Sequence, residues 1–207
     1  MTAPSERRVH PIEVRSYEIL RARVDTSSLP ALTRAVVERV IHASADVDYL
    51  GDLVISSEQD LANAQQALLA GRPVVTDAEM VAAGITSVAA VCRVRQAVTA
   101  KGLTRSARGM QLAFDEVGQG AIWVIGNAPT ALEQLLTMDA KPALVVGLPV
   151  GFVGAVESKQ ALRNSGYPGI SNVSEKGGSA VAAAALNALL YAAVPTSSQA
   201  TQEGSTP

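Results

Sequence analysis

His42 is one of two histidines in this chain of 207 residues, and Glu38, Arg39 and Asp46 stand near it in the stretch VVERVIHASADVDYLG. With an unperturbed pKa of about 6.5, a histidine can exchange a proton near neutral pH. Asp46 follows by one helical turn, and the end of a helix favours a positive charge. We therefore expect the pKa of His42 to lie near this value or above it, so that the side chain can donate a proton at neutral pH.

The helix that carries His42 has an apolar side and a mixed side. At about 100° per residue, His42 points nearly opposite the apolar side and lies beside Ala35, Glu38 and Arg39. A solvated polar face is the ordinary explanation of such a pattern. The small side chains on this face also allow another group to approach closely, so a ligand-facing surface is the alternative. The apolar stripe contains Leu32, Thr33, Val36, Val37, Val40 and Ile41.

Other common patterns of catalytic and ligand-binding residues are absent from the sequence. It contains neither GxGxxG nor GxxxxGK[ST], so a dinucleotide or ATP site is not supported. It also lacks the GxSxG serine motif and the HExxH zinc motif. The single cysteine, Cys92, excludes an internal disulfide and a thiolate metal cluster, and we predict a small buried side chain. We expect no metal site.

Composition argues against two kinds of partner. The formal net charge is −2 and the isoelectric point is about 5.7, so no basic face is expected to bind nucleic acid. No apolar stretch reaches the length of about 20 residues that a membrane helix needs. The N-terminus MTAPSERRVH lacks the apolar core of a signal peptide. We expect a soluble cytoplasmic protein with neither a nucleic-acid nor a membrane partner.

The elements that must position these side chains alternate between helices and short Val/Ile runs. Such alternation predicts a single α/β domain with a mainly parallel sheet flanked by helices. We place this domain at residues 1–194 and a disordered, weakly hydrophobic tail at 195–207. Helices are expected at 11–24, 27–46, 57–71, 78–84, 104–118, 127–139, 154–165 and 177–193. Strands are expected at 52–56, 73–77, 89–94, 121–126, 142–147 and 169–173.

Three predicted strand-to-helix junctions are rich in glycine: VIGNAPTAL, VVGLPVGFVGAVESK and NVSEKGGSAV. Ligands of parallel sheets bind outside the carboxyl ends of the strands, and helix N-termini there favour anions. We therefore predict that Gly126, Asn127 and Gly151 contact a ligand. Asn127 is also the candidate cap of its helix, with Pro129 just inside.

Two further pairs of residues have both a chemical and a structural interpretation. Asp77 and Glu79 could do acid–base chemistry, but an Asp after a strand more often caps the next helix, and we favour capping. Arg105 and Arg108 stand at a helix start, where cations oppose the helix dipole. An anionic ligand explains them, and so does a solvated turn.

Taken together, five stretches resemble one family of enzymes. They are RVIHASADVDYLGDLVIS, PVVTDAEMVAAGI, GLTRSA, AIWVIGNAPTAL and KPALVVGLPVGFVGAVESKQAL. In this order, from about Ile12 to Tyr191, they resemble the precorrin-8X methylmutases of corrin biosynthesis. The combination of GLPVGFVGAVESK with IGNAPTAL is the most specific part of the match. Tyr17 stands where the family usually has Phe, and the connection over 93–105 is shorter than usual.

The resemblance implies an isomerase that moves a methyl group from C-11 to C-12 of precorrin-8X or cobalt-precorrin-8. The product is hydrogenobyrinate or cobyrinate, and no organic cofactor is used. It implies a homodimer with the tetrapyrrole near the subunit interface. His42 matches the family's catalytic histidine, Arg39 its arginine three residues earlier, and Ser16 the substrate-contacting serine. Arg105, with Arg39, suits the carboxylates of the macrocycle.

Two other functions remain as alternatives. A non-catalytic tetrapyrrole carrier would bind the same macrocycle, and only turnover measurements separate it from the enzyme. An α/β enzyme acting on another anionic compound is the third possibility, since three helix N-termini are predicted at one edge of the sheet.

Overall fold

The computed structural model describes residues 9–98 and 102–193, so the predicted tail at 195–207 lies outside the described residues. The strands are β1 (Leu53–Ile55), β2 (Val74–Thr76), β3 (Ala90–Cys92), β4 (Ile122–Ile125), β5 (Leu144–Gly147) and β6 (Gly169–Asn172). The helices are α1 (Pro11–Arg23), α2 (Ala31–Ser44), α3 (Tyr49–Asp52), α4 (Glu58–Leu69), α5 (Glu79–Gly84), α6 (Arg105–Val117), α7 (Pro129–Thr137), α8 (Ala155–Asn164) and α9 (Ser179–Ala192).

The strands form one sheet in the order β1-β6-β5-β4-β2-β3, and every pair except β1–β6 is parallel. The predicted α/β fold with a mainly parallel sheet is therefore confirmed. The antiparallel pair brings Leu53, the first residue of β1, opposite Asn172, the last residue of β6. As a result, the chain just before β1 lies at the edge where the parallel strands end.

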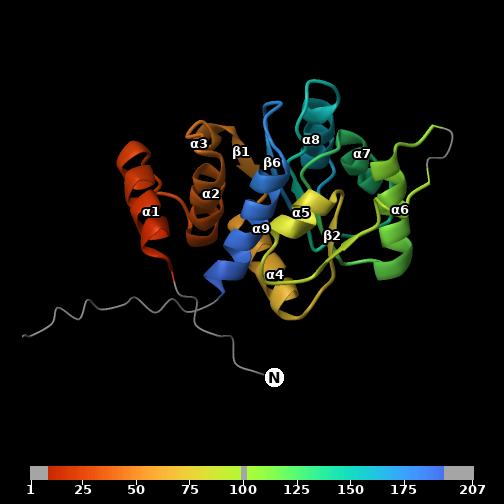
Figure 1. Ribbon diagram of the computed structural model, residues 1–207, viewed down its shortest axis with the longest axis horizontal. Coiled ribbons are helices and arrows are strands. Elements are labelled where there is room, and N and C mark those ends of the chain that lie inside the picture. The colour runs from red at the N-terminus through yellow and green to blue at the C-terminus, as the bar shows by residue number, and fades with distance from the viewer. Residues whose placement is uncertain (1–8, 99–101, 194–207) are drawn as a thin grey trace, which may run out of the picture.

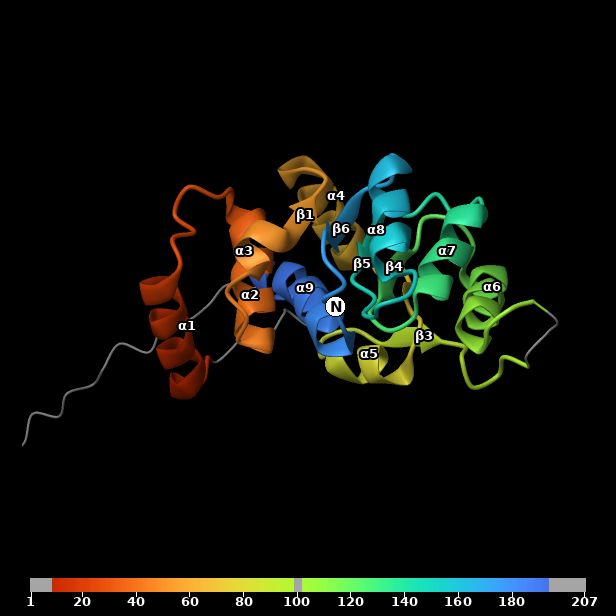
Figure 2. The ribbon, with the colours of Figure 1, turned by 90° about the horizontal axis from the view of Figure 1, so that it is seen from above.

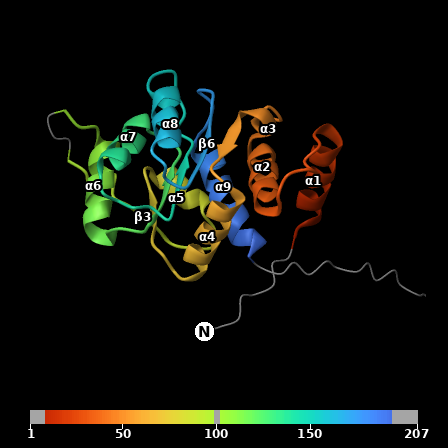
Figure 3. The ribbon, with the colours of Figure 1, turned by 180° about the vertical axis from the view of Figure 1, so that it is seen from behind.

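Side chains alternate between two hydrophobic cores along each central strand. Ile122 and Val124 of β4 pack into the core shared with α2, α4 and α9. Trp123 and Ile125 pack into the core beneath α6, α7 and α8. Figure 2 shows α9 and α5 on one side of the strands and α7 and α8 on the other. α1 lies outside both layers, against the outer side of α2, and α6 lies at the other end of the molecule (Figures 1 and 3).

Local sequence signals account for most helix ends. The hydroxyl of Ser57 accepts a hydrogen bond from the Asp60 backbone N–H and caps α4. Gly71 and Gly118 follow α4 and α6 with φ of +76° and +69°, a conformation that glycine adopts readily. Cys92 is 8% exposed, which confirms its predicted burial. The single turn α3 was not predicted.

Candidate active site

The mixed face of α2 is covered by α1. Ser16 Oγ lies 2.8 Å from His42 Nδ1, and the ring of Tyr17 stacks on the imidazole with centroids 5.1 Å apart and planes 9° apart. The solvated-face interpretation is therefore wrong, because the small residues of this face admit a neighbouring helix. These two contacts fix the position of the imidazole ring through its Nδ1 atom and its face.

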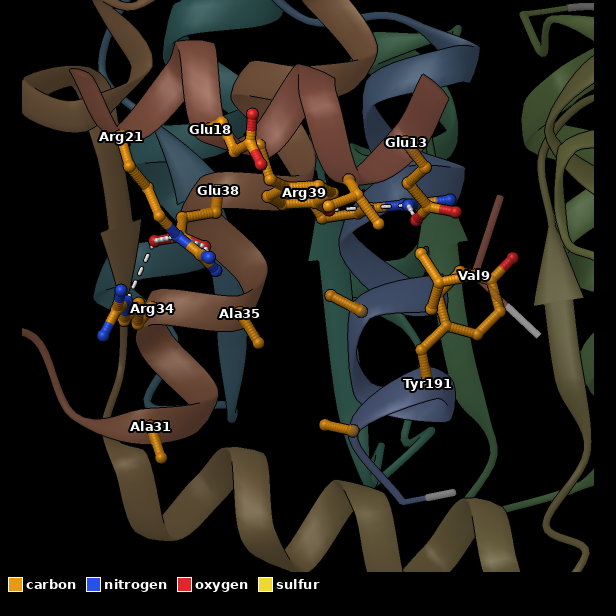
Figure 4. A pocket seen from close by; sticks show the side chains of 14 residues that line it. Val9, Glu13, Glu18, Arg21, Ala31, Arg34, Ala35, Glu38, Arg39 and Tyr191 are labelled. Carbon is orange, nitrogen blue, oxygen red and sulfur yellow. Dashed lines mark hydrogen bonds and ion pairs between the residues drawn. The ribbon is translucent and has the colours of Figure 1, made fainter. Parts of the chain in front are cut away.

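Arg39 lies one turn before His42 and is held by residues of two other helices, α1 and α9. Its Nη1 donates to the Glu13 carboxylate and lies 3.4 Å from the Tyr17 hydroxyl, both on α1. Its guanidinium carbon lies 4.8 Å from the ring centroid of Tyr191 on α9, a cation–π contact. Figure 4 shows Arg39 reaching across toward Glu13. The arginine is thus oriented beside His42, with 18% of its side chain exposed.

Glu38 is the buried anion of the same helix face, with 3% exposure. It accepts hydrogen bonds from Arg21 of α1, Arg34 of α2 and the hydroxyl of Thr26 in the connecting loop. Burial acts to raise the pKa of Glu38, but these hydrogen bonds outweigh it and lower the pKa to about 2. Glu38 therefore fastens α1 to α2 below the histidine.

A cleft of about 820 Å³ opens between α1, α2 and the end of α9. Figure 4 shows Ala31 and Ala35 on one wall and Tyr191 on the other, with Arg39 across the top. His42 is not among the lining residues and lies one turn beyond Arg39. The lining comprises Val9, Glu13, Val14, Tyr17, Glu18, Arg21, Ala31, Arg34, Ala35, Glu38, Arg39, Ala188, Tyr191 and Ala192.

The pKa of His42 lies below its usual value in the free protein, whereas the sequence predicted a pKa near that value or above it. Burial lowers the pKa of His42, and the positive charge of Arg39 lowers it further, while Glu13 partly opposes both. Asp46 does not offset these effects, because its carboxylate pairs with Lys176 Nζ at 2.8 Å. The imidazole is therefore neutral at neutral pH. When the Ser16 hydroxyl donates to Nδ1, the ring carries its proton on Nε2.

The glycine-rich junctions lie together at the carboxyl edge of the sheet. The Gly151 N–H donates to the Glu175 carbonyl at 3.2 Å, which joins the β5–α8 and β6–α9 junctions. A Cβ atom on Gly126 would lie 2.8 Å from the Cβ of Ala182 in α9, so the β4–α7 junction packs tightly there too. Lys176 bonds Asp46 and Asp48, at 2.8 and 3.0 Å, and so ties this edge to the turn that follows His42.

Asp77, rather than Asn127, caps the β4–α7 junction. The cap position of α7 is Ala128, and Asn127 makes no side-chain cap hydrogen bond. The buried Asp77 carboxylate accepts the backbone N–H groups of Gly126, Asn127 and Ala128 at 2.7 to 3.0 Å. The sequence predicted that Asp77 caps a helix, but it predicted the following helix, α5. The carboxylate instead binds a junction about fifty residues later in the chain.

Arg105 is not brought to His42 within one chain. It begins α6, which lies at the opposite end of the molecule from α1 and α2 (Figure 1). Its side chain is exposed. Gly126, Asn127 and Gly151 lie between these ends, at the junctions. Sequence reasoning missed Glu13, Tyr191 and Lys176, because their roles depend on long-range packing that no local pattern reports.

Neither a metal cluster nor a membrane span is present in the described part of the chain. Within residues 9–98 and 102–193, no group of three or more His, Cys, Asp or Glu side chains is arranged to hold a metal ion. None of the helices in these ranges has the length and apolar character needed to cross a membrane.

Residues 11–192 match the family model described as precorrin-8X methylmutase. The chain belongs to the precorrin-8X methylmutase family. A precorrin-8X methylmutase from Pseudomonas aeruginosa is 42% identical over 191 residues, covering 84% of this chain and 91% of that protein. A cobalt-precorrin-8 methylmutase from Salmonella typhimurium is 39% identical over 197 residues, covering 87% and 93%. The crystal structure of precorrin-8x methyl mutase from Thermus thermophilus superposes with a TM-score of 0.76 at 32% identity, covering 87% and 96%.

The predicted membership of the precorrin-8X methylmutase family is thus confirmed. Members of the family are isomerases of cobalamin biosynthesis. The names of the family and of these relatives therefore support an enzyme rather than a non-catalytic carrier.

Proposed function

We propose that the protein moves the C-11 methyl group of precorrin-8X, or of cobalt-precorrin-8, to C-12, giving hydrogenobyrinate or cobyrinate. The C-11–methyl bond breaks, the C-12–methyl bond forms and the ring double bonds shift. No atom is gained or lost, so neither an oxidant nor an organic cofactor is required. The observation that carries the proposal is the fixed imidazole of His42, with Arg39 one turn away, in a chain of this family.

His42 acts from its Nε2 side. The Ser16 hydroxyl donates to Nδ1 and holds the neutral tautomer whose Nε2–H faces the substrate. This N–H donates a hydrogen bond to the macrocycle near ring C, which draws electron density from the ring and eases the methyl shift. The proton remains shared with His42 and is not consumed. Such assistance typically contributes about 10²- to 10⁴-fold to the rate.

A substrate carboxylate binds Arg39. The substrate also lies against the junctions that contain Gly126, Asn127 and Gly151, whose backbone N–H groups already bond Asp77 and the Glu175 carbonyl. Arg39 is already oriented by Glu13, Tyr17 and Tyr191, so it loses little freedom when a carboxylate binds. Ser16 contacts the substrate as well as the imidazole. Small residues along this surface suit the flat ring.

The functional protein is a cytoplasmic homodimer with the tetrapyrrole near the subunit interface. Arg105 supports this arrangement, because one chain holds it far from His42 (Figure 1). In a dimer, Arg105 of one subunit binds a carboxylate of the substrate whose ring meets His42 of the other.

Turnover of precorrin-8X by the purified protein tests the proposal. We expect the absorption spectrum of the macrocycle to change to that of a corrin under multiple-turnover conditions. His42→Ala should lower kcat by about 10²- to 10⁴-fold and keep substrate binding. His10→Ala is the matched control, because His10 caps the start of α1 and should leave kcat unchanged. Normal turnover by His42→Ala would refute the role of His42 while leaving the reaction itself standing.

A further inference from the structure

Lys159 is a charged side chain buried in the protein core. It lies in α8, in the stretch GAVESK, and is 0% exposed. Its Nζ donates to Asn172 Oδ1 at 2.8 Å, to the Lys176 carbonyl at 2.8 Å and to the Ser174 carbonyl. All three acceptors belong to one short segment, residues 172–176, which we call the β6 turn. Three acceptors match the three N–H groups of an ammonium ion.

Asp52 holds the same β6 turn from the other side. Its carboxylate accepts the backbone N–H groups of Val173 and Ser174 at 3.0 and 2.8 Å, and the Asn172 side-chain amide at 2.8 Å. The ammonium of Lys159 therefore binds oxygen atoms of the turn, and the carboxylate of Asp52 binds its N–H groups. The positive charge of Lys159 and the negative charge of Asp52 thus hold the carbonyl groups and the N–H groups of the turn, respectively.

The β6 turn connects two parts of the proposed site. Its Glu175 carbonyl accepts the Gly151 N–H, and the side chain of Lys176 bonds Asp46 and Asp48 in the turn after His42. A displaced β6 turn would thus disturb both a glycine-rich junction and the end of the helix that carries His42.

We propose that Lys159 is a positioning residue that sets the β6 turn in the geometry needed to bind the tetrapyrrole. The proposal rests on the proposed function. Burying a charge seldom adds net stability compared with a well-packed apolar side chain, so stability alone does not explain a lysine here. Burial, and to a smaller extent the charge of Arg163, lower the pKa of Lys159 to about 8, while Asp52 and Glu175 act to raise it. The side chain is therefore protonated at neutral pH and can donate to all three acceptors.

Lys159→Met tests this role, because methionine has a similar length and no N–H group. We expect the KM for precorrin-8X to rise about 10- to 100-fold with a smaller change in kcat, since small displacements of binding groups cost this much. The melting temperature should fall, because three buried oxygen atoms lose their hydrogen-bond donor. Leu162→Ala is the matched control: Leu162 lies in the same helix, is 1% exposed and makes no hydrogen bond to the β6 turn through its side chain. It should lower the melting temperature and leave KM unchanged.

Amide hydrogen exchange tests the positioning without any substrate. In Lys159→Met, the amides of Val173 and Ser174 should exchange about tenfold faster or more, and in Leu162→Ala they should not, because local opening follows the loss of local bonds. Unchanged exchange together with an unchanged KM would overturn the role of Lys159. If the parent protein fails to convert precorrin-8X, the proposed function fails, and the exchange result still decides whether Lys159 sets the turn.

Lys176→Met keeps the proposal testable if Lys159→Met does not fold. Lys176 is partly exposed, so its replacement should be tolerated, yet it removes the link to Asp46 and Asp48. A raised KM in Lys176→Met supports positioning through the β6 turn. A normal KM in a folded Lys176→Met contradicts it.

Discussion

At the scale of single residues, His42 is defined more by its neighbours than by its own type. The Ser16 hydroxyl and the stacked Tyr17 ring fix its orientation, and burial together with the charge of Arg39 lowers its pKa. A neutral imidazole can donate one hydrogen bond. Transfer of its remaining proton to the substrate would leave an imidazolate anion, which is unfavourable near neutral pH. The direction of its pKa shift therefore separates two mechanisms that have the same catalytic residue.

The pH dependence of kcat/KM should distinguish these mechanisms. The pKa of His42 in the free protein lies below its usual value, so protonation occurs only on the acid side. If the neutral form is active, kcat/KM is level near about pH 8 and falls as the pH drops toward about 5. Because the charge of Arg39 lowers the pKa, Arg39→Met should move this acid limb to higher pH. A rate that instead falls as the pH rises through the same pKa indicates a protonated His42.

At the scale of helices and strands, the packing of α1 on α2 creates the site, and Glu38 holds the pair together. The carboxylate receives hydrogen bonds from Arg21, Thr26 and Arg34 and is almost fully buried. Its folded pKa of about 2 lies below the usual value of 4.5. The corresponding stabilisation is complete above the unfolded pKa and is lost as the pH falls toward the folded pKa.

Glu38→Gln should therefore reduce the acid sensitivity of folding. We expect the variant to be less stable than the parent at neutral pH by as much as about 3 kcal/mol, with the difference shrinking between about pH 4.5 and about pH 2. Urea unfolding at several pH values across this range measures the difference in the free energy of unfolding. Glu18→Gln is the control, because Glu18 is an exposed carboxylate that pairs with its neighbour Arg15 on α1. Equal acid dependence in Glu38→Gln and the parent would contradict the assignment.

The sequence predicts elements better than it predicts the contacts between them. The apolar stripe of α2 follows from the spacing of its apolar residues and is observed. The opposite face of α2 packs against α1. This packing depends on the path of the loop between the two helices, and the spacing of residues within a helix does not predict that path. The direction of β1 is equally hidden, because a strand of three residues has no directional signal. Asp77 was recognised as a capping residue, but its target lies far along the chain.

At the scale of the whole molecule, the proposed site residues are spread along the long axis. α1 and α2 lie at one end, the glycine-rich junctions in the middle and α6 at the other end (Figures 1 and 2). A tetrapyrrole that uses both His42 and Arg105 therefore needs two chains. The proposed homodimer supplies two such composite sites, related by twofold symmetry.

Subunit complementation tests composite sites. His42→Ala and Arg105→Ala should each be impaired as homodimers. A heterodimer of the two variants, purified with two different tags, has one intact site of two and should recover about half of the parental activity. If Arg105 acts with His42 of its own chain, the heterodimer shows no gain over the variants. Arg108→Ala, whose side chain bonds Gln111 in its own helix, is the control and should remain active.

The two histidines occupy different parts of the same helix packing. His10 accepts the Ile12 N–H at the start of α1, whereas the His42 ring lies against Tyr17 in the middle of that helix. A stacked aromatic ring changes the NMR chemical shifts of protons above its face. The ring protons of His42 and His10 should therefore give separate signals without any isotope label or added probe. The detachment of α1 from α2 can thus be followed separately from the fraying of its first turn, in the unmodified protein and during substrate titration.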